Sequence, residues 1–149
     1  MLKNLANRGR GGYMSNRLSD SVLLIEDNAE LVTNLEYILR VEGIAFRSAL
    51  DGLTAIPLLR RYMPRVVVLD LYLPHMTGFE VLDYIRSNAG LAGTHVIVLS
   101  GATQSSRELE SMADAADTHF CKPVDLDLLI DEIRRGLGQA QAGSAPEHP

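Results

Sequence analysis

The chain has 149 residues, 46% hydrophobic and 22% charged, a composition typical of a soluble globular protein with one core. No apolar run approaches the roughly 20 residues that a membrane-spanning helix needs, and the single cysteine excludes an internal disulfide and indicates a cytoplasmic protein. Residues 1–17 carry four of the 14 Lys and Arg and no acid. Residues 18–149 therefore hold all 19 Asp and Glu, a charge that would repel nucleic acid.

The two ends of the sequence are polar and poor in large apolar residues. Residues 1–19 predict a disordered basic arm, and residues 139–149 predict a disordered tail. The folded domain is therefore expected over residues 20–138.

The first folded segment alternates between strand and helix patterns. Residues 21–27 (SVLLIED) form an aliphatic run that is typical of a strand. Apolar residues at helical spacing follow from Leu31 and predict a helix that ends near Gly43. Residues 44–49 (IAFRSA) then predict a short strand.

A second helix and a third strand are expected next. Asp51 is suited to cap a helix that runs toward Tyr62. Pro57 lies inside this helix and should kink or shorten it. Residues 65–71 (RVVVLDL) predict the third strand, which is almost wholly aliphatic.

The second half repeats this alternation. Thr77 and Glu80 have the spacing of a capping box and open a helix over residues 78–87. Residues 94–100 (THVIVLS) predict a fourth strand, and residues 118–123 (THFCKP) a brief fifth. Two more helices are expected, one from the capping pair Ser105 and Glu108 and one that begins after Asp125.

Strands that read as unbroken aliphatic runs are usually covered on both faces of a parallel sheet. Five strands that alternate with helices therefore predict an α/β fold, a doubly wound five-stranded parallel sheet flanked by helices. Ligands in such folds bind at the carboxyl ends of the strands.

Polar residues stand where four of the five predicted strands end. The first strand ends in Glu26 and Asp27, the third in Asp70, the fourth in Ser100 and the fifth in Lys122. Because parallel strands place these ends at one edge of the sheet, we expect the five side chains to meet there.

Three carboxylates at one edge repel each other unless a cation lies among them. Lys122 supplies one positive charge, and Mg²⁺, which prefers oxygen ligands, would supply more. A cation, a lysine and a hydroxyl together suit a site that stabilises phosphoryl charge. Asp70 is then expected to act as a nucleophile that carries a phosphoryl group as an acyl phosphate.

The motifs that carry these residues resemble those of a known family, the response-regulator receiver domains of bacterial two-component signalling. The matching stretches are IED with Asp27, DLYLPHMTG with Asp70, VLSGA with Ser100 and CKP with Lys122. These four residues are separated by 43, 30 and 22 positions, close to the family's usual intervals. The resemblance covers residues 20–138 and implies the flavodoxin-like receiver fold.

The resemblance also implies a Mg²⁺ site. Asp27 corresponds to the direct ligand, Glu26 to an acid that acts through water, and Asp70 to the phosphoacceptor. The backbone carbonyl of Tyr72 corresponds to the remaining protein ligand. The bulk of Tyr72 beside the path of an attacking water indicates slow self-dephosphorylation.

The remaining matched positions belong to the switch. Ser100 corresponds to the hydroxyl that turns toward the phosphoryl oxygen, and Lys122 to the residue that pairs with the phosphoryl group. Pro123 follows a peptide bond that is typically cis in the family. His119 stands at the second switch position, where the family usually has Tyr or Phe, which leaves the aromatic half of the switch open.

The function implied is that of a stand-alone, phosphorylation-activated switch and not of a classical enzyme. Its expected partners are a histidine kinase or histidine-phosphotransfer protein and a downstream protein effector, without nucleic acid or membrane. A homodimer through the face of the fourth helix, the fifth strand and the last helix is a further expectation.

Two alternatives stay open. One is a phosphatase with an aspartyl nucleophile, against which Tyr72 stands, because those enzymes place a second acid two residues after the nucleophile. The other is a receiver-like interaction module that accepts no phosphate, for which the departure at His119 is the support.

Overall fold

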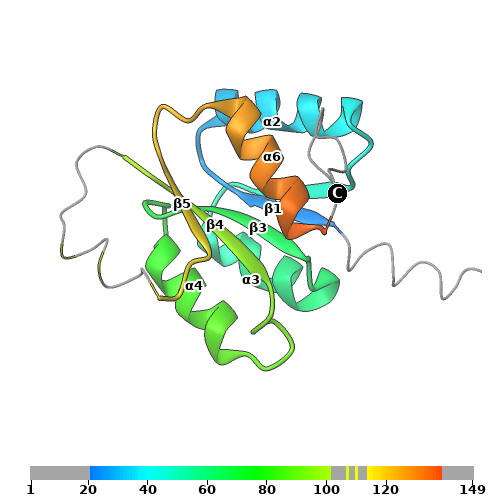
Figure 1. Cartoon of the computed structure of the whole chain (residues 1–149). Helices are drawn as coiled ribbons and strands as arrows, with labels where there is room; N and C mark the ends of the chain where they lie inside the picture. Colours follow the sequence, from blue (N-terminus) through cyan, green and yellow to red (C-terminus); the bar gives the residue numbers. More distant parts are fainter. Residues whose placement is uncertain (1–20, 102–106, 108–109, 111–113, 139–149) are drawn as a thin grey trace, which may run out of the picture.

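The protein forms one five-stranded parallel sheet, seen in a computed structural model that describes residues 21–101, 107, 110 and 114–138 (Figure 1). The strand order is β2-β1-β3-β4-β5, and every neighbouring pair is parallel. This confirms the predicted doubly wound sheet. The strands are β1 (Val22–Ile25), β2 (Phe46–Ala49), β3 (Val66–Asp70), β4 (His95–Ser100) and β5 (Thr118–Cys121).

Helices cover both faces of the sheet. Helices α2 (Ala29–Val41) and α6 (Leu126–Gly136) cover one face, and α3 (Gly52–Tyr62) and α4 (Gly78–Ser87) cover the other, as the doubly wound fold requires (Figure 1). None of these helices is long and apolar enough to cross a membrane.

Several predictions fall outside the described residues. Most of the helix predicted from Ser105 and Glu108 lies there, as do the basic arm over residues 1–19 and the tail over residues 139–149. The predicted dimer face includes the same helix, so it also lies partly outside the described residues.

Each helix begins at a residue whose side chain accepts a backbone N–H of the first turn. The four capping residues are Asn28, Asp51, Thr77 and Asp125. Thr77 and Glu80 form both hydrogen bonds of the predicted capping box. Pro57 does not shorten its helix, which continues to Tyr62, so that part of the prediction is wrong.

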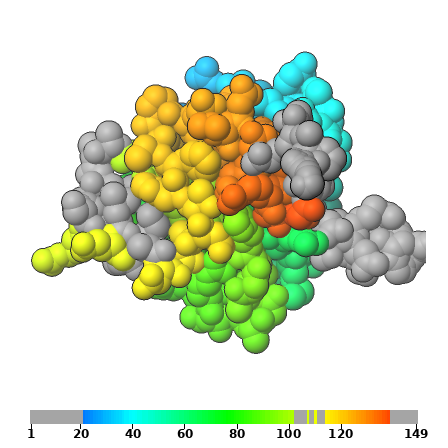
Figure 2. Space-filling model, in the orientation of Figure 1, coloured from blue at the N-terminus to red at the C-terminus, as the bar shows by residue number. Residues whose placement is uncertain are grey.

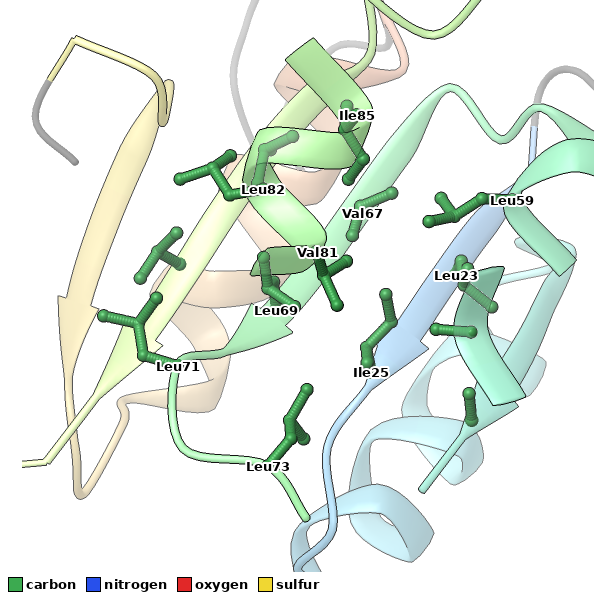
Figure 3. Packing of buried hydrophobic residues seen from close by; sticks show 14 of the residues in the cluster. Leu23, Ile25, Leu59, Val67, Leu69, Leu71, Leu73, Val81, Leu82 and Ile85 are labelled. Atoms are coloured by element: carbon green, nitrogen blue, oxygen red, sulfur yellow. The ribbon is translucent and has the colours of Figure 1, made fainter. Parts of the chain in front are cut away.

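The core has two layers, one on each face of the sheet. Because side chains alternate along a strand, Leu23, Ile25, Val67 and Leu69 face α3 and α4, where Figure 3 shows them packed against Leu59, Val81 and Ile85. Their neighbours in sequence, among them Leu24 and Val68, face α2 and α6. Burying such a side chain contributes about 1.5–3 kcal/mol, so both layers hold the strand ends in place.

The start of α4 lies directly against the end of β3. A Cβ atom on Gly78 would come 2.2 Å from the carbonyl oxygen of Asp70 and 2.5 Å from Cα of Leu71. Glycine is therefore required here, because any side chain would push the helix away from the strand that carries Asp70.

A polar network joins α6 to the end of the sheet at which β4 and β5 begin. Glu132, 8% exposed, accepts a hydrogen bond from Thr118 at 2.5 Å and lies 2.8 Å from Nε2 of His95 and 3.0 Å from Arg135. Burial raises the pKa of Glu132, but the hydrogen bonds from Thr118 and His95 and the charge of Arg135 outweigh it, so the pKa lies below its ordinary value of 4.5.

We predict that Glu132 stabilises the fold in a pH-dependent way. A lowered carboxyl pKa contributes stability above its unfolded value, and this contribution is lost as the pH falls below about 4.5. Glu132→Gln should therefore lower the free energy of unfolding by about 1–3 kcal/mol at pH 7, and the difference from wild type should shrink as the pH approaches 3. Urea denaturation across this range measures it, with the exposed Asp83→Asn as control. A difference that does not change with pH would contradict the role given to Glu132.

Candidate functional site

Four of the five predicted site residues, Glu26, Asp27, Asp70 and Lys122, meet at the carboxyl ends of the strands, while Ser100 contacts His119 instead. Glu26 follows β1, Asp70 ends β3 and Lys122 follows β5. One carboxylate oxygen from each of Glu26, Asp27 and Asp70 lies within 4.8 Å of the other two. Residues far apart in the sequence are thus assembled around one point by the parallel sheet.

Lys122 lies between two of these carboxylates. Its Nζ is 2.9 Å from Oε1 and 3.1 Å from Oε2 of Glu26, and 3.2 Å from Oδ2 of Asp70. Burial lowers the pKa of Lys122, but its hydrogen bond with Glu26 and the charges of both acids outweigh burial and raise it. Lys122 is therefore a firmly held cation.

Glu26 is the most deeply buried member of the site, with 0% of its surface exposed. Its Oε2 accepts hydrogen bonds from Lys122 and, at 3.0 Å, from the backbone N–H of Asn28. Its Oε1 accepts no hydrogen bond, since the contact with Lys122 is ionic only. Burial raises the pKa of Glu26 despite both hydrogen bonds, and the charge of Asp70 adds to the rise.

The charges of the site do not balance. Among the described residues, one ammonium group faces three carboxylates, and burial disfavours the charge on Glu26. A divalent cation would offset this excess, and a set of carboxylate oxygens that includes the exposed Asp27 matches the ligands that Mg²⁺ prefers. The residues present therefore fit a Mg²⁺ ion.

Asp70 is 5% exposed and is held by contacts to both of its oxygens. The backbone N–H of Tyr72 donates to Oδ1 at 3.1 Å, while Oδ2 faces Lys122. The ring of Tyr72 is 46% exposed and packs edge-on against Phe79, 6.3 Å between ring centres. An aromatic ring thus stands at the rim beside the carboxylate.

The predicted switch residues Ser100 and His119 contact each other. Ser100 is 1% exposed, and its Oγ lies 2.5 Å from Nε2 of the exposed His119 ring. The peptide bond between Lys122 and Pro123 is cis, as the resemblance implies.

A groove opens beside Lys122 between the start of α2 and the segment that leads into α6. Its volume is about 500 Å³. Leu31, Val124 and Leu126 make its wall apolar, and Asn28 and Asn34 add amide groups. The charged centre of the site is therefore continuous with a surface that suits a larger molecule.

Two residues that support the site were not predicted from the sequence. Asn28 caps α2 and donates its backbone N–H to Glu26, and Gly78 permits the close approach of α4 to β3. A signal existed for both, because Asn before a helical pattern is a typical cap and Gly after Thr77 follows the capping position.

Comparisons with known proteins agree with this geometry. Residues 22–134 match the model of the response regulator receiver domain. The chain is 33% identical over 128 residues to the transcriptional regulatory protein KdpE of Mycobacterium tuberculosis, covering 86% of this chain and 55% of KdpE. It is 32% identical over 125 residues to the cell cycle transcriptional regulator CtrA of Caulobacter vibrioides, covering 81% and 53%. The chain thus spans about half the length of these relatives.

Solved structures show the same fold. The signal receiver domain of a DNA-binding response regulator from Colwellia psychrerythraea is 30% identical, with a TM-score of 0.71 over 80% of this chain and 98% of that one. The receiver domain of a sensor histidine kinase from Pseudomonas aeruginosa, described with a magnesium ion in its active-site cleft, is 23% identical, with a TM-score of 0.71 over 80% and 98%.

We predict that Lys122 offsets the cost of burying Glu26. Lys122→Met keeps most of the side-chain length but removes the cation, and should lower the free energy of unfolding in Mg²⁺-free buffer by about 1–3 kcal/mol. Adding Glu26→Gln to this variant should recover part of the loss, because no buried charge then remains unpaired. Urea denaturation measures both variants, and Arg60→Met removes an exposed cation as control. Equal stability of Lys122→Met and wild type would refute the pairing.

Proposed function

Since the chain belongs to the response-regulator receiver domain family, we propose that it is a phosphorylation-activated switch that accepts a phosphoryl group on Asp70. The observation that carries this proposal is the meeting of Asp70, Lys122 and the two further acids at one point. A nucleophilic carboxylate, a held cation and a divalent-ion site are the groups that phosphoryl transfer needs.

The phosphoryl donor we propose is a phosphohistidine of a histidine kinase or phosphotransfer protein. A carboxylate oxygen of Asp70 forms a bond to phosphorus as the phosphorus–nitrogen bond of the donor breaks, and the electron pair of that bond stays on the imidazole nitrogen. Nζ of Lys122, already 3.2 Å from Asp70, lies within reach of the transferred oxygens. Mg²⁺ held by Glu26, Asp27, Asp70 and the carbonyl of Tyr72 would offset the negative charge of those oxygens.

The groove beside Lys122 is the surface that we assign to the donor protein. Its apolar wall of Leu31, Val124 and Leu126 fits the side chains of a helix, and it leads directly to the charged centre. A helix packed there would present its phosphohistidine to Asp70. This is why a protein donor is favoured over a small one.

The reset and the output belong to the same proposal. Hydrolysis of the acyl phosphate restores Asp70, and the exposed ring of Tyr72 at the rim should slow the approach of water. The output is a contact with another protein in the cytoplasm, because the acidic charge of residues 18–149 disfavours nucleic acid. KdpE and CtrA are named transcriptional regulators, so a DNA-linked output is the competing outcome.

We predict that Asp70 is the position that is phosphorylated. Incubation with acetyl phosphate and Mg²⁺ should add the mass of one phosphoryl group, and Asp70→Asn should abolish the adduct because an amide cannot form the acyl phosphate. Intact-mass spectrometry measures it, with Asp83→Asn, an exposed acid on α4, as the matched control that keeps the adduct.

Three outcomes would overturn the proposal. An adduct that persists in Asp70→Asn would place the phosphoryl group elsewhere. Continuous release of phosphate from many different phosphate esters would make the protein a phosphatase. Absence of any adduct with wild type would favour the interaction module that accepts no phosphate.

A further inference from the structure

The hydrogen bond between Ser100 and His119 joins two neighbouring strands. His119 lies opposite Val98 in the register of β4 and β5, and Ser100 lies two residues beyond Val98. Side chains two apart on a strand share a face, so Ser100 and His119 project from the same face of the sheet. This explains how Oγ and Nε2 come within 2.5 Å.

Asp70 belongs to the other face. It pairs in register with Leu99, the residue before Ser100, and Leu99 packs in the core layer beneath α2 and α6. Val98 packs in the layer beneath α3 and α4. The bond to His119 therefore engages the Ser100 hydroxyl on the face opposite the one from which Asp70 reaches Lys122.

We propose that His119 is a positioning residue that holds the Ser100 hydroxyl away from Asp70 in the resting protein. The inference rests on the proposed function, because it matters only if Ser100 later binds a phosphoryl oxygen on Asp70. Breaking the bond to His119 is then part of the free-energy cost of activation. A histidine at this position can therefore hold the Ser100 hydroxyl by a hydrogen bond, which a phenylalanine could not form.

The bond occupies the hydroxyl group of Ser100. When Nε2 of His119 accepts the hydroxyl proton of Ser100, that proton is unavailable to a phosphoryl oxygen. Ser100 must therefore leave His119 before it can donate to a phosphoryl group on Asp70.

His119 is exposed on β5, and the charged residues nearest to it in the sequence have partners of their own. Asp117 is paired with Arg86 of α4 at 2.8 Å, and Lys122 is paired with Glu26 and Asp70. Figure 2 shows the segment from β5 to α6, in yellow and orange, at the surface between α2 and α4.

The test is the affinity of the full chain for beryllofluoride, a phosphoryl mimic, with Mg²⁺ present, measured by calorimetry. At pH 8, His119→Leu should bind about 3- to 10-fold more tightly than wild type, because no bond to Ser100 must be broken. His119→Gln, whose amide group can take the place of Nε2, should stay within about twofold of wild type. Cys121→Ser, exposed two residues along the same strand, is the matched control and should bind like wild type.

One further comparison separates positioning from a merely structural role. In a Ser100→Ala background, His119→Leu should have no effect.

The outcomes are distinguishable. Wild-type and His119→Leu proteins that bind beryllofluoride equally well, or an effect of His119→Leu that persists in the Ser100→Ala background, would overturn the role of His119 and leave the phosphoacceptor proposal intact. A wild-type chain that binds no beryllofluoride would overturn both.

Discussion

The buried charge of Glu26 is the constraint on which the rest of the site depends. A carboxylate with no exposed surface is costly unless a cation and hydrogen bonds satisfy it, and the fold supplies Lys122 and the backbone N–H of Asn28. These partners come from the end of β5 and the start of α2, so they meet only when the parallel sheet is complete. Lys122 also contacts Asp70, so one cation links the buried Glu26 to Asp70.

Alternation along the strands divides the end of the sheet into two functional faces. Glu26, Asp70 and Lys122 lie together and carry the charge, while Ser100 and His119 form a hydrogen-bonded pair on the opposite face. A phosphoryl group on Asp70 would add negative charge to the first face. The second face can respond only if Ser100 leaves His119, so the register of β4 and β5 links the chemistry to the surface of the protein.

Much of this arrangement could be predicted from the sequence. The aliphatic runs predict the strands, and the rule that parallel strands end at one edge predicts that Asp70 lies near Lys122. The capping pair Thr77 and Glu80 likewise fixes the start of α4. These features depend on local patterns and on topology, both of which a sequence records directly.

Other features depend on side-chain partners that no local pattern specifies. His119 reads as a departure from the family, and its bond to Ser100 follows only from the register of two strands. No local pattern marks His95 as a partner of Glu132, but the two side chains lie 2.8 Å apart and join α6 to the sheet. Pro57 is tolerated because Ala55 and Leu59 hold the helix around it against the sheet. This depends on tertiary packing and not on helix propensity.

The most direct measurement is a Mg²⁺ titration of the full chain followed by backbone amide NMR. If the three carboxylates share one ion, the amides of Asp27, Asn28 and Tyr72 should shift together along one saturable curve, and Asp27→Asn should abolish that curve. Amides that respond independently or not at all would show that these acids do not form a common site.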